Sequence, residues 1–343
     1  MTMTVAILGA GAWGTALAVH LATRAHAKPL VRLWARSAEQ AKSMSQSRVN
    51  ATYLDGVVIP AVVDVTSDLV DAVRADLLIV ATPVSALAGV AARLVEAGAR
   101  APLAWLCKGF VDSNGGWSLP HRRIAAMWPT DVAVVSGPSF AGEVANGLPT
   151  ALAVAATRPQ LASAIASLIR GDTLRAYESD DLAGVETGGA VKNVLAIAAG
   201  ASDGLGFGHN ARAALITRGL AEVVRLSVAL GGRRETLMGL AGLGDLVLTC
   251  TGDASRNRRV GLALAGNKPL DRILADLGHV AEGVLAARAV HAIAGEHAVE
   301  MPICEAVHRV LHEAVPVRDA VLGLLRREPR AEFQSTGIAG KRR

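Results

Sequence analysis

The stretch that decides the fold is residues 5–24, VAILGAGAWGTALAVHLATR. Its first four residues are apolar, as expected of a buried strand, and the pattern that follows is helical to about Arg24. A turn of the form G-x-G-x-x-G, from Gly9 to Gly14, joins the strand to the helix. In this context the glycine pattern indicates a dinucleotide site, with the pyrophosphate at the helix N-terminus.

Each glycine of the turn has its own steric task. Gly9 permits the tight turn, Gly11 lets a pyrophosphate approach the backbone, and Gly14 lets the helix pack closely on the strand. We therefore predict the first β-α unit of a Rossmann-type sheet.

The end of the second predicted strand, residues 30–34, bears on the choice of cofactor. A site that prefers NAD usually carries an acidic residue here, which holds the ribose 2′-hydroxyl. This chain has Arg36 instead, and a guanidinium suits a 2′-phosphate. We expect NADPH to bind at least as well as NADH. The alternative is that Arg36 is only solvated and that Glu39 contacts the ribose.

Further apolar runs continue the same alternation of strands and helices. Strands are predicted at 76–81, 103–107, 132–135, 151–155 and 174–177, and helices near 84–97, 117–127 and 159–170. Such doubly wound sheets bind ligands outside the carboxyl ends of their strands. Lys108 and the loop 136–141 follow two of these strands, so we expect both in the site.

The strand signals stop near residue 180, and long apolar helices continue to about residue 327. The predicted fold class is therefore α/β, a Rossmann-type doubly wound sheet followed by an all-α C-terminal domain. We place a dinucleotide-binding domain at 1–183, a helical substrate domain at 184–330 and a polar tail at 331–343.

The first helix of the second part carries Lys192 in a run of small apolar residues. Side chains on a helix lean toward its N-terminus, so Lys192 leans over Gly188 and Gly189. Two adjacent glycines cost a helix roughly 1 kcal/mol each relative to alanine. Our hypothesis is that a ligand rests on these glycines beneath the Lys192 ammonium. The alternative is a surface lysine beside a tight contact between helices.

The run 240–259, LAGLGDLVLTCTGDASRNRR, contains a second group of polar residues. Asp245 follows a Gly-x-Gly turn. We therefore expect a helix to begin at this residue and to fix the position of its carboxylate. Ser255 is a predicted N-cap of a helix that ends near Ala265. Arg256 in its first turn is expected to bind a phosphate, because cations there are otherwise unfavourable. We expect Arg258 and Arg259 to be solvated.

The composition of the chain limits the kinds of partner and cofactor that we expect it to bind. The formal net charge is +5, but the basic residues are scattered and only 3% of residues are aromatic, which does not favour nucleic acid. Three distant cysteines and scattered histidines argue against a disulfide framework and against a metal site. The longest uncharged run, 77–92, is too short for a membrane span. We expect a soluble, cytoplasmic protein without a metal.

An ordered series of motifs resembles the bacterial NAD(P)-dependent glycerol-3-phosphate dehydrogenases over nearly the whole chain. The motifs are GAGAWGTALA at 9–18, CKG at 107–109, SGPSFAGEV at 136–144, VKNVLAIAAGASDGL at 191–205, NARAALITRGL at 210–220, GLAGLGDLVLTCT at 239–251, SRNRR at 255–259, AEG at 281–283 and MPI at 301–303. The resemblance implies reversible reduction of dihydroxyacetone phosphate to sn-glycerol 3-phosphate with NADPH or NADH. It also implies a supply of glycerol 3-phosphate for phospholipid synthesis.

The resemblance also implies roles for single residues. Lys192 would transfer the proton. From the chemistry of the residues themselves we expect Asn193 and Asp245 to orient the proton donor and the substrate. The implied substrate contacts are Lys108, Gly137, Ser139, Lys192, Asp245, Ser255, Arg256 and Asn257. The implied cofactor contacts are Gly9, Gly11, Ala12, Trp13, Gly14, Arg36, Lys108, Ala141, Arg256, Val280 and Glu282. From the sequence alone, Glu282 is equally a surface carboxylate.

Two other functions stay open from the sequence. One is a different two-domain reductase, of the β-hydroxyacid or 6-phosphogluconate type, in which a lysine also lies on the helix between the domains. The other is a non-catalytic NADP(H)-binding sensor. The sequence does not decide whether the chain is a monomer or a homodimer.

Overall fold

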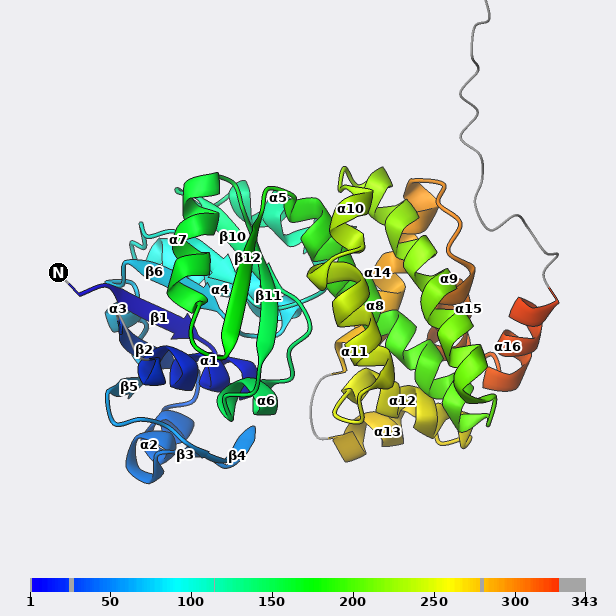
Figure 1. The fold of residues 1–343 in the computed structure, drawn as a ribbon, viewed down its shortest axis with the longest axis horizontal. Helices are drawn as coiled ribbons and strands as arrows, with labels where there is room; N and C mark the ends of the chain where they lie inside the picture. Colours follow the sequence, from blue (N-terminus) through cyan, green and yellow to red (C-terminus); the bar gives the residue numbers. More distant parts are fainter. Residues whose placement is uncertain (1, 25–27, 114, 278–280, 327–343) are drawn as a thin grey trace, which may run out of the picture.

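The computed structural model describes residues 2–24, 28–113, 115–277 and 281–326, which form a sheet-containing half and a helical half (Figure 1). The predicted polar tail 331–343 and the predicted cofactor contact Val280 lie outside these residues.

An eight-stranded sheet is the centre of the first half. Its order is β12-β11-β10-β7-β6-β1-β2-β5. The strands are β1 (Thr4–Leu8), β2 (Leu30–Trp34), β5 (Val63–Thr66), β6 (Leu77–Val80), β7 (Leu103–Trp105), β10 (Val132–Ser136), β11 (Thr150–Ala156) and β12 (Leu174–Ser179). From β5 to β10 neighbouring strands are parallel, whereas β11 is antiparallel to β10. Because β1 lies between β2 and β6, the chain reverses direction across the sheet next to the glycine-rich turn.

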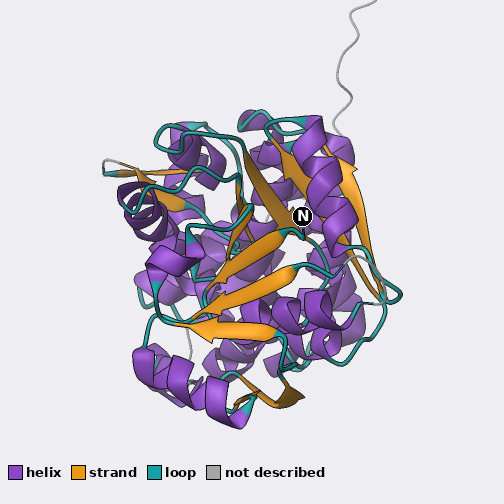
Figure 2. Cartoon of the chain, turned by 90° about the vertical axis from the view of Figure 1, so that its left-hand side faces the viewer, coloured by secondary structure: helices purple, strands orange, loops and turns teal. Residues whose placement is uncertain are grey.

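The residues of β1 alternate between the two faces of the sheet. Val5 and Ile7 pack in one core with the helices α1 (Ala12–Thr23) and α7 (Pro159–Ile169). Ala6 and Leu8 pack in the other core with α4 (Val84–Glu96) and α5 (Pro120–Ala125). Figure 2 shows the strands fanning out between helices. This doubly wound arrangement confirms the predicted fold class.

The second half is built around α8 (Leu182–Gly204), which is buried along almost its whole length. Its apolar residues lie on all sides, the pattern of a helix at the centre of a core. The helices that pack most extensively against it are α9 (Gly208–Ala229), α11 (Asp245–Thr251), α12 (Arg256–Ala265), α14 (Glu282–Glu296) and α15 (Pro302–His312). The remaining helices are α10 (Arg234–Leu237), α13 (Leu270–Leu277) and α16 (Val317–Leu325).

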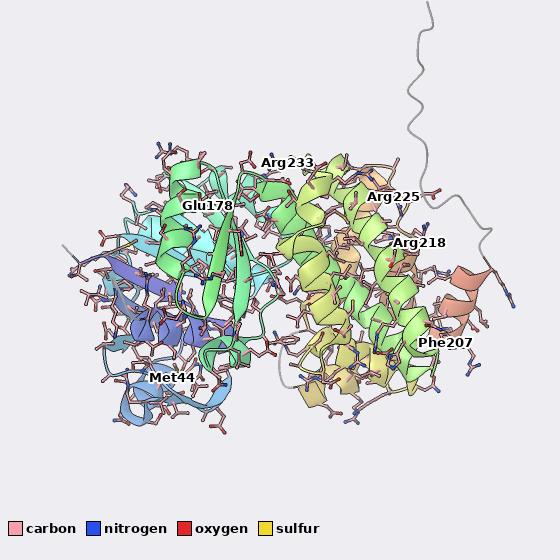
Figure 3. The ribbon with its side chains drawn as sticks, in the orientation of Figure 1. Met44, Glu178, Phe207, Arg218, Arg225 and Arg233 are labelled. Carbon is pink, nitrogen blue, oxygen red and sulfur yellow. The ribbon has the colours of Figure 1, made fainter. Side chains whose placement is uncertain are left out.

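The carboxylate of Asp181 fixes the start of α8. One oxygen accepts the Gly184 N–H at 2.8 Å, and the other accepts the backbone N–H of Arg233 at 2.8 Å. Figure 3 labels Arg233 where the loop before α10 meets α8. The helix that carries Lys192 is therefore anchored at its N-terminus.

One predicted helix differs from the observed structure. The sequence predicts a helix over residues 117–127, but Trp117 and Ser118 lie in the strand β9 (Gly116–Ser118), which pairs with β8 (Val111–Ser113). Gly115 has a φ of +88°, a turn conformation that glycine adopts without strain. The helix α5 therefore begins only at Pro120, a residue favoured in the first turn of a helix.

The sequence does not predict α2 (Ala38–Ser47), α3 (Leu69–Ala72), α6 (Ala141–Ala145), β5, or the small hairpin of β3 (Val49–Asn50) and β4 (Leu54–Val58). Of these elements, α2 and β3 carry side chains that bond to the Ala10 carbonyl of the glycine-rich turn, and α6 packs against α1.

Candidate active site

Two lysines share one buried carboxylate where the two halves of the chain meet. The Lys108 ammonium donates to Asp245 Oδ2 at 2.6 Å, and the Lys192 ammonium donates to Asp245 Oδ1. Lys192 also donates to Thr249 Oγ1 at 2.9 Å, and Lys108 to the Gly137 carbonyl at 3.1 Å. Asp245 is fully buried. Two positive charges and one negative charge leave this site with a net positive charge for an anionic substrate.

Each of the three charges comes from a different kind of element. Lys108 follows β7 and precedes Gly109, whose φ is +143°. Lys192 lies in the middle of α8. Asp245 is the first residue of α11 and follows the π-helical segment η1 (Leu240–Gly244). This confirms the prediction that Asp245 begins a helix, and π-helical turns are frequent at functional sites.

The environment of Lys192 lowers its pKa from an ordinary value of 10.5 to about 8. Burial is the main cause, because it disfavours the charged ammonium, and the Lys108 ammonium acts in the same direction. The Asp245 carboxylate opposes both effects. Lys192 is therefore buried rather than on the surface, and it holds a proton that it can release near neutral pH.

The two glycines beneath Lys192 contact protein. A Cβ atom at Gly188 would lie 2.3 Å from the Ala241 carbonyl oxygen of η1. A Cβ at Gly189 would lie 3.0 Å from Ser136 Oγ and 3.3 Å from Lys108 Cγ. The hypothesis that a ligand rests on these glycines is therefore wrong. They are small because η1 and the Lys108 side chain pack directly against α8.

The glycine-rich turn has the shape that a pyrophosphate needs. A Cβ at Gly14 would lie 2.0 Å from the Gly9 carbonyl oxygen, and Gly9 itself has a φ of +127°. A Cβ at Gly11 would meet nothing within 4 Å, so the space beside this residue is open. Among the residues that the structure describes, no side chain caps the N-terminus of α1. Free backbone N–H groups next to open space fit an anion, so these residues suit the phosphates of a dinucleotide.

A chain of contacts connects this turn to the lysines. Trp13 Nε1 donates to the Ser139 carbonyl at 3.1 Å, and Ser139 Oγ donates to the Gly137 carbonyl at 3.1 Å. The same Gly137 carbonyl accepts the Lys108 ammonium. Ala141 begins α6, which packs against α1. The structure thus brings the loop 136–141 between the predicted cofactor site and the charged group.

Arg36 and Glu39 both lie near the end of β2, and both are exposed. Ser37 caps α2 by accepting the Gln40 N–H at 3.2 Å, so Glu39 lies in the first turn of that helix. The part of the chain described here shows no hydrogen bond or ion pair for Arg36. Its guanidinium is free to meet a phosphate.

The helix α12 begins where the sequence predicts its start. Ser255 Oγ accepts the Arg258 N–H at 3.2 Å, and Gly266 follows the last residue, Ala265. Arg256 is exposed, and within the described ranges it has no ion pair. Arg256 is therefore an exposed cation at a helix N-terminus that forms no direct ion pair with a described residue.

The expectation that Arg258 is solvated is wrong. Its guanidinium pairs with Asp203 at 2.7 Å and with Asp253 at 2.9 Å, and only 11% of its side chain is exposed. The carboxylate of Asp203 also accepts Arg212 at 2.9 Å. Arg259 is exposed, as expected.

Two predicted site residues bond to each other. Asn257 Nδ2 donates to Asn193 Oδ1 at 3.0 Å, and the Gly283 N–H donates to Asn257 Oδ1 at 3.0 Å. These bonds connect α8, α12 and α14 directly beside Lys192. Asn193 is held by Asn257 and has no hydrogen bond to Lys192 within the described part of the chain.

Glu282 is the first residue of α14, and its carboxylate faces the N-terminus of α4. Burial raises the pKa of this carboxyl, whereas the nearby charge of Arg256 and the backbone N–H of Val84 oppose the rise. This contact joins the helical half to the sheet half. It places Glu282 on the same side of the site as Arg256.

Sequence reasoning missed Thr249 and the pair Glu186–His121. Thr249 lies four residues after Asp245 on α11, so helical spacing alone would place both on one face. Glu186, buried on α8, accepts the His121 backbone N–H at 2.9 Å and contacts its Nδ1 at 2.6 Å. No local pattern relates these two residues, which are 65 positions apart.

The residues that the structure describes contain no cluster of three or more His, Cys, Asp or Glu side chains suited to a metal ion. Nor do these residues include a helix with the length and apolar character needed to cross a membrane.

Comparison with known proteins extends these observations. The family model for the N-terminus of NAD-dependent glycerol-3-phosphate dehydrogenase matches residues 4–162, and that for its C-terminus matches residues 181–322. The glycerol-3-phosphate dehydrogenase (NAD(P)+) of Thiobacillus denitrificans is 53% identical over 334 residues, which cover 96% of this chain and 100% of the relative. The enzyme of Cupriavidus metallidurans is 54% identical, with the same coverage.

Comparison with solved structures identifies the same family. The crystal structure of glycerol-3-phosphate dehydrogenase from Coxiella burnetii has a TM-score of 0.90 and 43% identity, and the match covers 95% of this chain and 99% of that one. A ketopantoate reductase from Ralstonia eutropha JMP134, with 16% identity and a TM-score of 0.59, shares the fold alone.

Proposed function

This chain belongs to the NAD-dependent glycerol-3-phosphate dehydrogenase family, and from this premise we propose the role of each group in its active site. The chain is an NAD(P)-dependent oxidoreductase that reduces dihydroxyacetone phosphate to glycerol 3-phosphate. The other functions considered, a different reductase and a non-catalytic sensor, are therefore not retained. The observation that carries the proposal is the buried Lys192 ammonium, which Asp245 and Thr249 hold in one orientation.

Lys192 donates the proton. When bound, the reduced nicotinamide supplies a hydride for C2 of the substrate. Negative charge then grows on the C2 oxygen, where a positioned ammonium stabilises it and transfers a proton to it. A pKa of about 8 suits this task, because such a group is protonated at neutral pH and still releases its proton readily. Asp245 orients Lys192, and Lys108 adds positive potential.

The remaining roles are assigned from the contacts described above. We assign the pyrophosphate to the turn from Gly9 to Gly14, including Ala12 and Trp13. Gly137, Ser139 and Ala141 lie between this turn and Lys108, where substrate and nicotinamide would meet. Ser255, Arg256 and Asn257 form the start of α12, to which we assign the substrate phosphate, and Glu282 lies beside Arg256.

We expect Arg256→Ala to raise KM for dihydroxyacetone phosphate by about 10- to 100-fold, the effect of losing a charge-assisted hydrogen bond. The kcat should change much less, because the phosphate anchors the substrate away from the reacting carbon. Steady-state kinetics with NADPH would measure both constants. Arg259→Ala, an exposed arginine on the same helix, is the control and should leave KM unchanged. An equal loss of activity toward unphosphorylated dihydroxyacetone would contradict the anchor role.

We expect Arg36→Asp to lower the ratio of kcat/KM for NADPH to that for NADH by at least about 10-fold, because a carboxylate replaces the cation facing the 2′-phosphate. Glu39→Gln tests the alternative. If Glu39 contacts the ribose, this variant should bind NADH more weakly than the wild type. If Arg36→Asp leaves the ratio unchanged, Arg36 does not select the cofactor.

Four broader expectations remain proposals. The first is a boundary between the domains near Ala183, which the end of β12 at Ser179 and the start of α8 at Leu182 support. The others are a cytoplasmic location, association as a homodimer, and a supply of sn-glycerol 3-phosphate for phospholipid synthesis.

A further inference from the structure

Two side-chain amides converge on one carbonyl of the glycine-rich turn. Gln40 Nε2 donates to the Ala10 carbonyl oxygen at 2.8 Å, and Asn50 Nδ2 donates to the same oxygen at 3.0 Å. Asn50 Nδ2 also donates to Thr15 Oγ1, in the first turn of α1, at 2.8 Å. None of these three residues belongs to the roles assigned above.

The position of this carbonyl fixes the direction of the next N–H group. A peptide unit is planar and trans, so its C=O and N–H bonds point in opposite directions. With the Ala10 carbonyl held toward Gln40 and Asn50, the N–H of Gly11 must point away from them. Among the described residues no hydrogen bond uses this N–H, and the space beside Gly11 is open.

The two donors are themselves held in place. Asn50 is 1% exposed and lies at the end of the short strand β3, with Thr15 fixing its amide. Gln40 lies one helical turn before Met44 on the same face of α2. Met44, labelled in Figure 3, is buried and anchors that face of the helix. The amides therefore meet the Ala10 oxygen without first having to be ordered.

An unheld carbonyl in this turn would harm anion binding. If the peptide between Ala10 and Gly11 rotated, its oxygen would bring partial negative charge toward the pyrophosphate in place of an N–H donor. Two hydrogen bonds to one oxygen oppose this rotation. The arrangement is typical of a pre-organised binding loop.

We propose that Gln40 and Asn50 are positioning residues for the dinucleotide, which hold the Ala10–Gly11 peptide with its N–H toward the pyrophosphate. The inference rests on the NAD(P) site assigned above. No residue of α2 or β3 has a proposed contact with the pyrophosphate. Through Gln40 and Asn50, however, both elements would hold the turn that binds it.

The test is calorimetric titration of the full chain with two probes. One probe, 2′-phospho-ADP-ribose, contains the pyrophosphate, and the other, adenosine 2′-monophosphate, lacks it. Gln40→Met removes the donors at nearly constant size and should raise the Kd for 2′-phospho-ADP-ribose by about 3- to 10-fold. The Kd for adenosine 2′-monophosphate should change by less than about 2-fold. The double variant Gln40→Met/Asn50→Leu should lose more binding free energy for 2′-phospho-ADP-ribose than the two single variants lose together, because both amides donate to one oxygen.

Gln46→Met is the matched control, since Gln46 is an exposed glutamine on the same helix. It should bind both probes like the wild type. The binding data separate this inference from the proposed function: if the wild type does not bind 2′-phospho-ADP-ribose, the proposed dinucleotide site fails, whereas if the wild type binds it and Gln40→Met binds it equally well, only this inference fails. Equal weakening of both probes, or no weakening of either, would overturn the inference. Gln40→Met alone decides the matter if variants of the buried Asn50 do not fold.

Discussion

Lys192→Met is expected to lower kcat for the reduction of dihydroxyacetone phosphate by at least about 10³-fold, because it removes both the proton donor and the charge that stabilises the developing alkoxide. The Kd for NADPH, measured by fluorescence titration, should change by less than about 3-fold, since Lys192 has no assigned contact with the phosphates. Methionine fills the buried channel of the lysine side chain, so the fold should persist. A near-normal kcat would end the assignment.

Lys192→Arg separates charge from proton transfer. Arginine keeps the positive charge but does not release its proton in proteins. We expect kcat to stay within about 10-fold of the methionine variant, because proton transfer alone contributes roughly 10²- to 10⁴-fold. If the arginine variant recovered most of the activity, the lysine would act by charge alone.

The pH dependence of the wild type follows from the same group. Reduction needs the protonated ammonium, so kcat/KM for reduction should be high below pH 8 and fall as pH rises through the Lys192 pKa of about 8. Oxidation of glycerol 3-phosphate needs the neutral amine and should rise over the same interval. Opposite profiles in the two directions are the expected signature, and parallel profiles would contradict it.

Asp245→Asn is expected to have the second large effect. The carboxylate raises the Lys192 pKa against burial and against Lys108, so its loss should move the pKa further below about 8. The reduction profile should shift to lower pH, and kcat/KM at pH 8 should fall by about 10²-fold, since each unit of pKa is a factor of ten in protonation and the orienting bond is also lost.

Stability should change with pH in the same variant. Breaking a buried pair leaves uncompensated charge and costs about 3–5 kcal/mol of unfolding free energy. The folded-state pKa of Lys192 lies below its ordinary value, so the folded chain binds fewer protons than the unfolded chain. The unfolding free energy therefore rises as pH rises through that interval, and the deficit of Asp245→Asn should be smaller at high pH. Urea unfolding at several pH values would measure it.

Asp203→Asn is the control for this variant. Asp203 is also a largely buried carboxylate that accepts two cations, Arg212 and Arg258, but it does not contact Lys192. Its loss should lower stability and leave the pH profile of reduction in place. If both variants shifted the profile alike, the role of Asp245 would be structural.

The central strands could be predicted from the sequence because they are buried on both faces. All four residues of β6 are buried, and a run such as Leu77–Val80 is apolar whatever its neighbours are. The sequence does not predict the strand β5 because it lies at the sheet edge, where Asp64 is exposed and Thr66 is partly exposed. The helix α2 was missed because its sequence is mostly polar, so it lacks the apolar periodicity that indicates a helix.

The candidate site likewise has features that could be predicted from the sequence and features that could not. The glycine-rich turn and the cap at Ser255 could be predicted because their chemistry depends on residues close in sequence. The contact of Lys108 with Asp245 spans 137 positions, and no local pattern sets such a distance. Gln40 and Asn50 are ordinary amides in the sequence, and only the folded turn gives them a common partner. The error about Gly188 and Gly189 has the same origin, because the atoms that fill the space above them come from η1 and Lys108.

The shared carboxylate also makes the acid depend on both halves of the chain. Its three charges belong to a loop after a strand, a central helix and a later helix, so no contiguous part of the chain shorter than residues 108–245 contains all of them. The glycine-rich turn, in contrast, lies within residues 9–14 of the sheet half. The turn assigned to the pyrophosphate and the alignment of the acid therefore depend on separate parts of the fold.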